Sequence, residues 1–188
     1  MRVLAIDCST EWLAVALGDA SGFHERREHA GQTHSERVLP LVDALLAEVG
    51  WKLADLGGIA FGAGPGSFTG VRIACGVAQG LALGRGLPVA AVSTLEAIAQ
   101  DAHRAHGATR VFACTDARMK EVYVAAYDRA DARWREVLAK AGRLEHHLDC
   151  VLYSQGADEY VVKPLEPQEL VLRLEPVRPA EAQEGEPR

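Results

Sequence analysis

The chain has 188 residues, 48% of them apolar and 24% charged, which fits one globular domain or two small lobes sharing a core. Its formal net charge of -6 argues against a protein that holds nucleic acid mainly through its own field, although a role beside a basic partner remains open. No apolar run approaches the ~20 residues of a membrane-spanning helix, and the carboxylate of Asp7 comes too early for a signal peptide.

The first fifty residues contain three strand segments, of which the first two are rich in apolar residues, and one well-marked helix. The strands are expected at residues 3–6, 12–17 and 23–29. Thr33 and Glu36 have the spacing of a capping box, so we expect the helix to begin there. Apolar residues recur at helical spacing as far as Gly50, which ends the helix, and Pro40 inside it should remove one hydrogen bond and bend it.

A glycine-rich turn and a helix of small residues follow a short strand at 58–62, in the sequence FGAGPGSFTGVRIACGVAQGLALG. Gly76, Gly80 and Gly84 stand four apart and so form one stripe on that helix. Glycine inside a helix costs roughly 1 kcal/mol relative to alanine. The stripe therefore indicates that another backbone comes very close, either from the chain's own sheet or from a second protein. Two further elements are expected: a strand at 88–92 and a helix at 94–106.

Helices interleaved with apolar strands predict an α/β layer fold with a mixed sheet. The opening pattern also recurs later in the chain. Residues 3–19 and 112–128 each contain a strand, a turn with an aspartate and a second strand, and their alignment pairs Asp7 with Asp116. The recurrence indicates a duplicated lobe.

The residues after 128 are less clearly patterned. Residues 129–143 suit either a continued hairpin or a solvated helix. Short strands are expected at 150–153 and 160–162 and a helix at 167–174, followed by a disordered tail. The predicted division is a first lobe at 1–107, a shortened second lobe at 108–174 and the tail at 175–188.

Cysteine and histidine spacing gives no sign of a metal site or a disulfide framework. No CxxC pair or zinc-ligand spacing occurs among Cys8, Cys75, Cys114 and Cys150. They are expected to be reduced core thiols of a cytoplasmic protein. No two histidines stand four apart, the spacing with which one helix face grips a metal ion, so no metal is predicted.

Five segments carry a specific resemblance to a known family: LAIDCSTEWLAVAL, HSERVLPLVDALLAEVG, IAFGAGPGSFTGVRIACGVAQGLALG, PVAAVSTLEAIAQ and TDARMKEVYVAAYD. In these segments residues 1 to about 128 resemble the TsaB (YeaZ-like) family, bacterial partner subunits with a Gcp-like domain in tRNA threonylcarbamoyladenosine (t6A) modification. The resemblance implies an actin-like, sugar-kinase-like (ASKHA) fold of two related lobes. It weakens after about residue 140, where family members carry a longer second lobe.

Residues 156–170 suggest a competing interpretation for the C-terminal part. GADEYVVKPL followed by PQEL is similar to the end of a response-regulator receiver domain. A receiver also needs an acidic cluster and a phosphorylated aspartate on earlier strands, and no complete set precedes this segment in the right order. A shortened second lobe is therefore favoured.

The glycine-rich turn first suggests a phosphate site, because backbone N–H groups at a helix start attract anions. It matches neither a Walker loop nor GxGxxG, and an N-cap at Ser67 or Thr69 explains its polar residues more simply. An actin-like nucleotide site would involve Asp7, Ser9 and Asp116. The segment after Asp7 lacks glycine and carries a repelling glutamate, so we expect that site to be degenerate.

The resemblance implies that two helices carry the function, because TsaB-like proteins pair with TsaD, or with themselves, through helices at these positions. Carried over by position, the contact candidates are His34, Arg37, Leu41 and Leu45 on the first helix and Thr69, Arg72, Ala74, Cys75 and Ala78 on the second. Packing of both helices on the chain's own sheet is the competing explanation of the same residues.

The resemblance therefore implies a non-catalytic partner subunit that stabilises a TsaD-like threonylcarbamoyltransferase and is joined by a TsaE-like ATPase. A homodimer is expected in isolation, with tRNA reached indirectly and no membrane involved. No cofactor is expected, except ATP or ADP at a joint interface with a partner. The competing hypotheses are an actin-fold ATPase or phosphotransferase that uses Asp7, and a signalling module.

Overall fold

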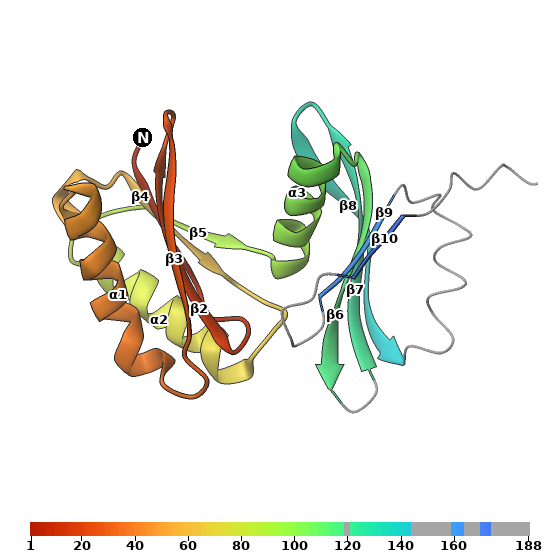
Figure 1. Cartoon of the computed structure of the whole chain (residues 1–188), viewed down its shortest axis with the longest axis horizontal. Coiled ribbons are helices and arrows are strands. Elements are labelled where there is room, and N and C mark those ends of the chain that lie inside the picture. Colours follow the sequence, from red (N-terminus) through yellow and green to blue (C-terminus); the bar gives the residue numbers. More distant parts are fainter. Residues whose placement is uncertain (119–120, 144–158, 164–169, 174–188) are drawn as a thin grey trace, which may run out of the picture.

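The computed structural model describes residues 1–118, 121–143, 159–163 and 170–173. Figure 1 shows two α/β lobes side by side, with two helices on the outer side of the first sheet and a third helix between the two sheets. Each sheet has five strands among the described residues. This is the two-lobed α/β architecture that the actin-like fold class predicts, with a shortened second lobe.

The first sheet has the strand order β3-β2-β1-β4-β5. Its strands are β1 (Val3–Asp7), β2 (Trp12–Asp19), β3 (Gly22–His29), β4 (Gly58–Gly62) and β5 (Val89–Val92). The first three form an antiparallel meander, whereas β4 runs parallel to β1 and β5 parallel to β4. Asp7 therefore lies where the parallel strands β1 and β4 end, the edge at which open α/β sheets place their sites.

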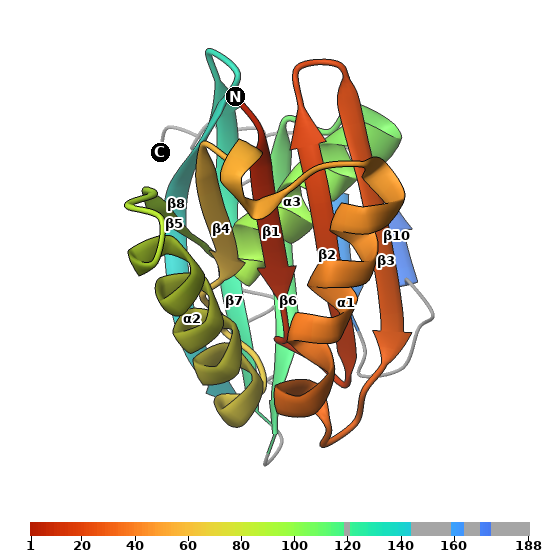
Figure 2. The same cartoon turned by 90° about the vertical axis from the view of Figure 1, so that its left-hand side faces the viewer.

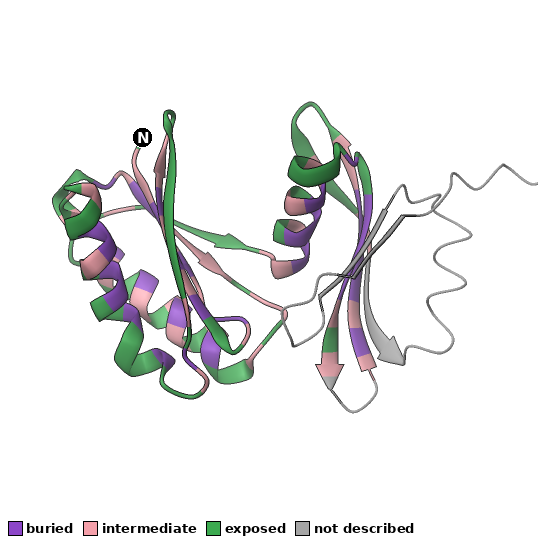
Figure 3. Cartoon of the chain, in the orientation of Figure 1, coloured by how far each residue is buried: buried purple, intermediate pink, exposed green. Residues whose placement is uncertain are grey.

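Two helices cover one face of this sheet. The helix α1 (His34–Val49) packs on β2 and β3, and α2 (Phe68–Leu83) packs on β1, β4 and β5. Figure 2 shows the two helices side by side across the sheet, and Figure 3 shows the buried rows along their inner sides. Alternate strand residues meet these rows in a core that includes Leu4, Ile6, Leu13, Val15, Leu17, Ile59, Val38, Leu45, Ala74, Ala78 and Ala82.

The third helix, α3 (Thr94–His106), packs on the second sheet. That sheet has the order β10-β9-β6-β7-β8, from β6 (Arg110–Arg118), β7 (Glu121–Ala130), β8 (Arg133–Arg143), β9 (Glu159–Lys163) and β10 (Leu170–Arg173). One core joins α3 to β6 and β7 through Leu95, Ile98, Ala99, Ala102, Val111, Ala113, Ala125 and Tyr127. The residues of the first core therefore end before α3 and those of the second core begin with it, whereas the predicted lobe boundary at residue 107 follows that helix.

Most elements of the first half lie where the sequence predicts them, and Gly50 ends α1 in the left-handed conformation with a φ of 71°. The predicted capping box is wrong. Thr33 has φ -98° and ψ 16°, outside the extended region that an N-cap side chain needs, and its hydroxyl accepts no amide. It donates to the Ala30 carbonyl oxygen at 2.8 Å instead.

The second lobe contains further differences from the sequence predictions. Residues 129–143 continue a hairpin, since β8 pairs with β7. Asp116 lies within β6, paired with Val122, so its predicted place in a turn is wrong. The helix expected at 167–174 is also wrong, because Leu170 to Arg173 form β10 and pair with β9. The strand expected at 150–153 and the tail from 175 lie outside the described residues.

The three α-helices of the described part have 13 to 16 residues. None of them is long and apolar enough to cross a membrane.

Candidate functional site

The glycine-rich turn packs directly on the turn that joins β1 to β2. A Cβ atom on Gly66 would collide with the carbonyl oxygen of Ser9, and a Cβ atom on Gly70 would collide with the carbonyl oxygen of Cys8. A neighbouring backbone therefore occupies the space of a side chain at both positions, which only glycine permits. These two glycines, rather than the stripe further along the helix, mark the close backbone approach within this chain.

Amide groups at the start of α2 are used inside the chain. The amide of Ser67 donates to the Ser9 carbonyl oxygen at 2.6 Å. The amide of Gly70 donates to Ser67 Oγ at 3.2 Å, which makes Ser67 the N-cap. A phosphate does not fit at these amides, because the chain's own oxygens already accept from them. The cap-and-turn interpretation of the motif is confirmed.

Asp7 contacts both the turn that follows β1 and the neighbouring strand β4. Its Oδ1 accepts a hydrogen bond from the Ser9 amide at 2.6 Å. Its Oδ2 lies so close to β4 that a Cβ atom on Gly62 would be only 2.8 Å away. The carboxylate is thus held between its own turn and the neighbouring strand.

A cavity of about 350 Å³ lies between the lobes. Its floor is the face of the first sheet turned away from α1 and α2, and the start of α3 closes one side; lining residues include Ala5, Asp7, Ala14, Ala16, Arg27, Ala60, Gly62, Ser93 and Thr94. Thr94 Oγ1 is buried there with no hydrogen-bond partner in the described structure. Of the three nucleotide-site candidates only Asp7 lines this cavity, because Ser9 is buried in the turn and Asp116 lies on β6 of the second lobe.

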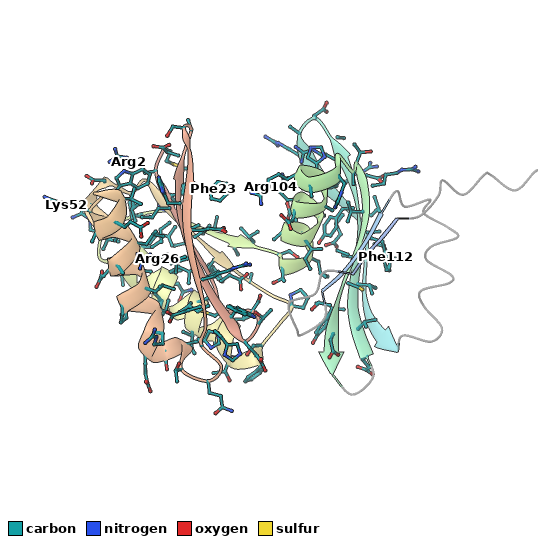
Figure 4. All side chains as sticks on the ribbon, in the orientation of Figure 1. Arg2, Phe23, Arg26, Lys52, Arg104 and Phe112 are labelled. Atoms are coloured by element: carbon teal, nitrogen blue, oxygen red, sulfur yellow. The ribbon has the colours of Figure 1, made fainter. Side chains whose placement is uncertain are left out.

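The lobes also meet at the tip of the β2–β3 hairpin. The guanidinium of Arg104 on α3 lies 5.5 Å from the ring centroid of Phe23, at the tip of the β2–β3 hairpin. Figure 4 shows the two labelled side chains pointing toward each other from opposite lobes. Near the start of α3, the Thr94 amide donates to the Gly64 carbonyl oxygen at 2.8 Å.

The structure separates the nine predicted contact residues into two groups. Arg37, Thr69, Arg72 and Cys75 are exposed or half-buried. The other five lie in the first core and do not face outward, which corrects the placement expected for His34, Leu41, Leu45, Ala74 and Ala78. The alanines of α2 fill the space against the sheet with their methyl groups, whereas glycine there would leave gaps.

The outward side of the two helices combines apolar side chains with bare backbone. A Cβ atom on Gly76 or Gly80 would have no atom within 4 Å. Phe68 is 72% exposed, Leu83 is 86% exposed at the other end of α2, and Leu39 on α1 is 45% exposed. We call the set of Leu39, Phe68, Arg72, Gly76, Gly80 and Leu83 the outer face.

Two arginines carry charge at this side of the molecule. The Arg72 guanidinium stacks 3.4 Å from the Phe68 ring centroid and donates to the Phe68 carbonyl oxygen at 2.9 Å. Arg37 makes two hydrogen bonds to Glu28 on β3, at 2.7 and 2.8 Å, and this pairing lowers the pKa of the Glu28 carboxyl. Such an exposed pair adds little stability, but it fixes the position of the Arg37 charge at the β3 edge of the first sheet.

Sequence reasoning missed Leu39, Phe68 and Leu83. Each is exposed although its helix buries another side against the sheet, and Leu39 and Leu83 directly follow the buried residues Val38 and Ala82. A scattered exposed apolar residue is ordinary, whereas a group of them on one surface indicates an interaction site. The helical spacing of these residues is visible in the sequence, but which side of each helix faces the sheet is known only from the structure.

Two of the three described thiols, Cys8 and Cys114, are buried, whereas Cys75 is half-buried. No group of three His, Cys, Asp or Glu residues in the described part could hold a metal ion. Burial, with a smaller contribution from the charge of Asp7, raises the pKa of the Cys8 thiol to about 12, and burial raises that of Cys114 to about 11. Both are therefore neutral thiols near pH 7, and Cys150 lies outside the described residues. His34 is buried with Nε2 at 3.4 Å from the Trp12 carbonyl oxygen.

Comparison with known proteins gives a consistent picture. The family model described as TsaD, tRNA N6-adenosine threonylcarbamoyltransferase, matches residues 26–156. The tRNA threonylcarbamoyladenosine biosynthesis protein TsaB of Escherichia coli K12 is 52% identical over 129 residues, which cover 69% of this chain and 56% of that protein. The TsaB protein of Haemophilus influenzae is 44% identical over 148 residues, covering 74% of this chain and 63% of the relative.

A solved structure shares this similarity in sequence and in fold. YeaZ from Pseudomonas aeruginosa superposes with a TM-score of 0.73 at 44% identity, covering 77% of this chain and 68% of that one. Another structure from the same organism, described as similar to the peptidase YeaZ, gives the same values. The chain spans between 56% and 63% of the length of the two curated relatives.

Proposed function

Because this chain belongs to the TsaB (YeaZ-like) family, we propose that it is a non-catalytic subunit of the t6A modification machinery. In this proposal it binds a TsaD-like threonylcarbamoyltransferase and stabilises it in its active state. The relatives' names supply the pathway, tRNA threonylcarbamoyladenosine biosynthesis. The exposed apolar residues and open glycines of α1 and α2 support the binding surface.

The observation that carries the proposal is the outer face of α1 and α2. Gly76 and Gly80 leave a strip of helix backbone open along the middle of α2. Phe68 and Leu83 stand at its two ends, and burying one such side chain against a partner contributes about 1.5–3 kcal/mol. A partner helix crossing at the two glycines would approach the backbone closely and cover both apolar residues. Nothing inside the described chain requires glycine at either position.

The proposal includes further partners. In isolation two copies can pair through the outer face, because a surface that binds itself about a two-fold axis forms a closed dimer. A TsaE-like ATPase would complete the complex, and tRNA would be held by the partner, in keeping with the net charge of -6. ATP or ADP would bind only where this chain and its partner meet.

A second candidate function is an ATPase or phosphotransferase that uses Asp7. The interlobe cavity favours it, with Asp7 on one wall and the unpartnered Thr94 Oγ1 on another. Against it, the turn amides are already occupied and the carboxylate of Asp7 is engaged by Ser9. ATP turnover by the purified chain, abolished in Asp7→Asn, would establish this candidate in place of the first.

Co-elution with a TsaD-like protein tests the proposal. The wild-type chain should co-elute at micromolar concentration. Gly80→Arg should not, because its side chain projects from the middle of the outer face and lies far from the core. Ala105→Arg is the matched control, since it adds the same charge at an exposed position of α3. Circular dichroism should show that both variants are folded. Wild-type elution as a free chain, or unchanged co-elution of Gly80→Arg, contradicts the proposal.

A further inference from the structure

We propose that Asp7 is a positioning residue for the outer face: it holds the turn after β1 in the place that sets α2 on the sheet. This goes beyond the proposed function in assigning a role to a cavity carboxylate, and it rests on that function only for what the outer face binds. The role needs a hydrogen-bond acceptor at Oδ1 rather than a negative charge.

In the first step, a hydrogen bond from the turn to Asp7 holds the turn in place. Oδ1 accepts from the Ser9 amide, two residues on, at 2.6 Å, which is an Asx-type turn. The carboxylate has little freedom to rotate, because Oδ2 abuts the backbone of β4 where Gly62 leaves just enough room. Asp7 itself is held in the sheet by its pairing with Ala14. The turn is therefore anchored to the centre of the first sheet.

In the second step, hydrogen bonds and backbone contacts join the turn to the first turn of α2. The Ser9 carbonyl oxygen accepts from the Ser67 amide at 2.6 Å, and Ser67 Oγ caps α2 by accepting from Gly70 at 3.2 Å. Ser9 is only 6% exposed. The carbonyls of Cys8 and Ser9 fill the side-chain positions of Gly70 and Gly66, so no space separates turn and helix. A displacement of the turn must displace the first turn of α2.

In the third step, a displacement at the N-terminus of α2 moves the rest of the helix, including its outer face. The row that α2 buries against the sheet consists of Ala74, Ala78 and Ala82, together with Gly70. Methyl groups interlock weakly with a sheet compared with the branched side chains that α1 buries, so they resist axial sliding and rotation poorly. Ile73, Val77 and Leu81 add partly buried contacts to the same core, and the N-terminus of α2 is where its backbone meets the backbone of the turn after β1. That contact therefore sets where α2 begins on the sheet. At a rise of ~1.5 Å per residue, Gly76 and Gly80 lie roughly 9 and 15 Å beyond Gly70 along the same rigid helix.

The experiment compares four variants by amide hydrogen exchange of the free chain and by co-elution with a TsaD-like protein. Asp7→Ala removes the acceptor, so the amides of Ser9, Ser67 and Gly70 should exchange about five- to tenfold faster, the loss of one hydrogen bond. Its co-elution should weaken by a similar factor. Asp7→Asn keeps an acceptor at Oδ1 and should restore both readouts to wild-type values.

Two glycine variants on β4 make the test independent of Asp7 itself. Gly62→Ala should reproduce the Asp7→Ala pattern, because the new methyl group would meet Oδ2 at 2.8 Å and displace the carboxylate. Gly58→Ala is its matched control in the same strand, where the nearest atom to a Cβ is at 3.6 Å, an ordinary contact. It should leave exchange at the start of α2 unchanged.

The outcomes separate this inference from the proposed function. Wild-type exchange at Ser67 and Gly70 in Asp7→Ala overturns the inference, and so does an Asp7→Asn chain that behaves like Asp7→Ala, since charge would then be required. A wild-type chain that binds no TsaD-like protein defeats the proposed function, while the exchange data still decide whether Asp7 positions α2.

Discussion

The contact between Gly70 and the Cys8 carbonyl oxygen predicts a large cost for adding one methyl group. In Gly70→Ala the new Cβ would overlap that oxygen and lie 3.0 Å from the Cys8 carbonyl carbon and 3.3 Å from Ser67 Cβ. Overpacking costs typically about 1–3 kcal/mol, and the upper end applies here because backbone atoms cannot rotate away. Losing the Ser67 cap adds about 1 kcal/mol. The helix propensity of alanine returns at most about 1 kcal/mol.

The expected net loss in the free energy of unfolding is therefore about 3 kcal/mol. For a chain of this length that lowers the melting temperature by roughly 6–12 °C. Gly80→Ala on the same helix is the control, because a Cβ there has no atom within 4 Å and the change should stabilise by up to about 1 kcal/mol. Urea unfolding, repeated at two protein concentrations because Gly80 lies on the outer face, measures both. Equal midpoints for the two variants would refute the packing argument.

Two further predictions concern the core and its thiols. Leu45→Ala should cost about 2–5 kcal/mol of unfolding free energy, because Leu45 is fully buried, whereas Leu39→Ala should leave stability nearly unchanged and weaken pairing. Urea unfolding measures the stability of both variants and gel filtration measures their pairing. A larger loss of stability in Leu39→Ala than in Leu45→Ala would be inconsistent with this structure. Stability should fall as pH rises from about 9 toward 12, because the folded chain keeps the protons of Cys8 and Cys114 that unfolded thiols release above their ordinary pKa of 9.0. Urea midpoints at pH 8 and 10 should show this drop, and it should shrink in Cys8→Ala; an undiminished drop would show that the buried thiol is not its source.

Local signals in the sequence were enough to predict the elements of the first lobe. The end of α1 at Gly50 and the start of α2 at Ser67 each depend on one residue with a strong conformational or capping preference. Thr33 shows the limit of such signals. It has the right spacing to Glu36, but the tight turn at Ala30 and Gly31 draws its hydroxyl to another acceptor.

Long-range pairing and helix orientation were not readable in the same way. Residues 170–173 became a strand because they pair with β9, a partner eight to fourteen positions earlier in the chain, and their own pattern suits a helix equally well. On α2 the alanine row and the glycine row are both made of small residues. Only the position of the sheet decides that Ala74 and Ala78 turn inward and that Gly76 and Gly80 turn outward.

The contrast among the three described thiols has a practical consequence. Cys8 and Cys114 are buried and resist ionisation, whereas Cys75 is half-buried and lies next to Gly76. A maleimide dye should therefore attach at Cys75 first, once Cys150 is replaced by serine. The emission of the dye would change when a partner covers the neighbouring glycines, so the natural Cys75 offers a labelling site for following complex formation in real time.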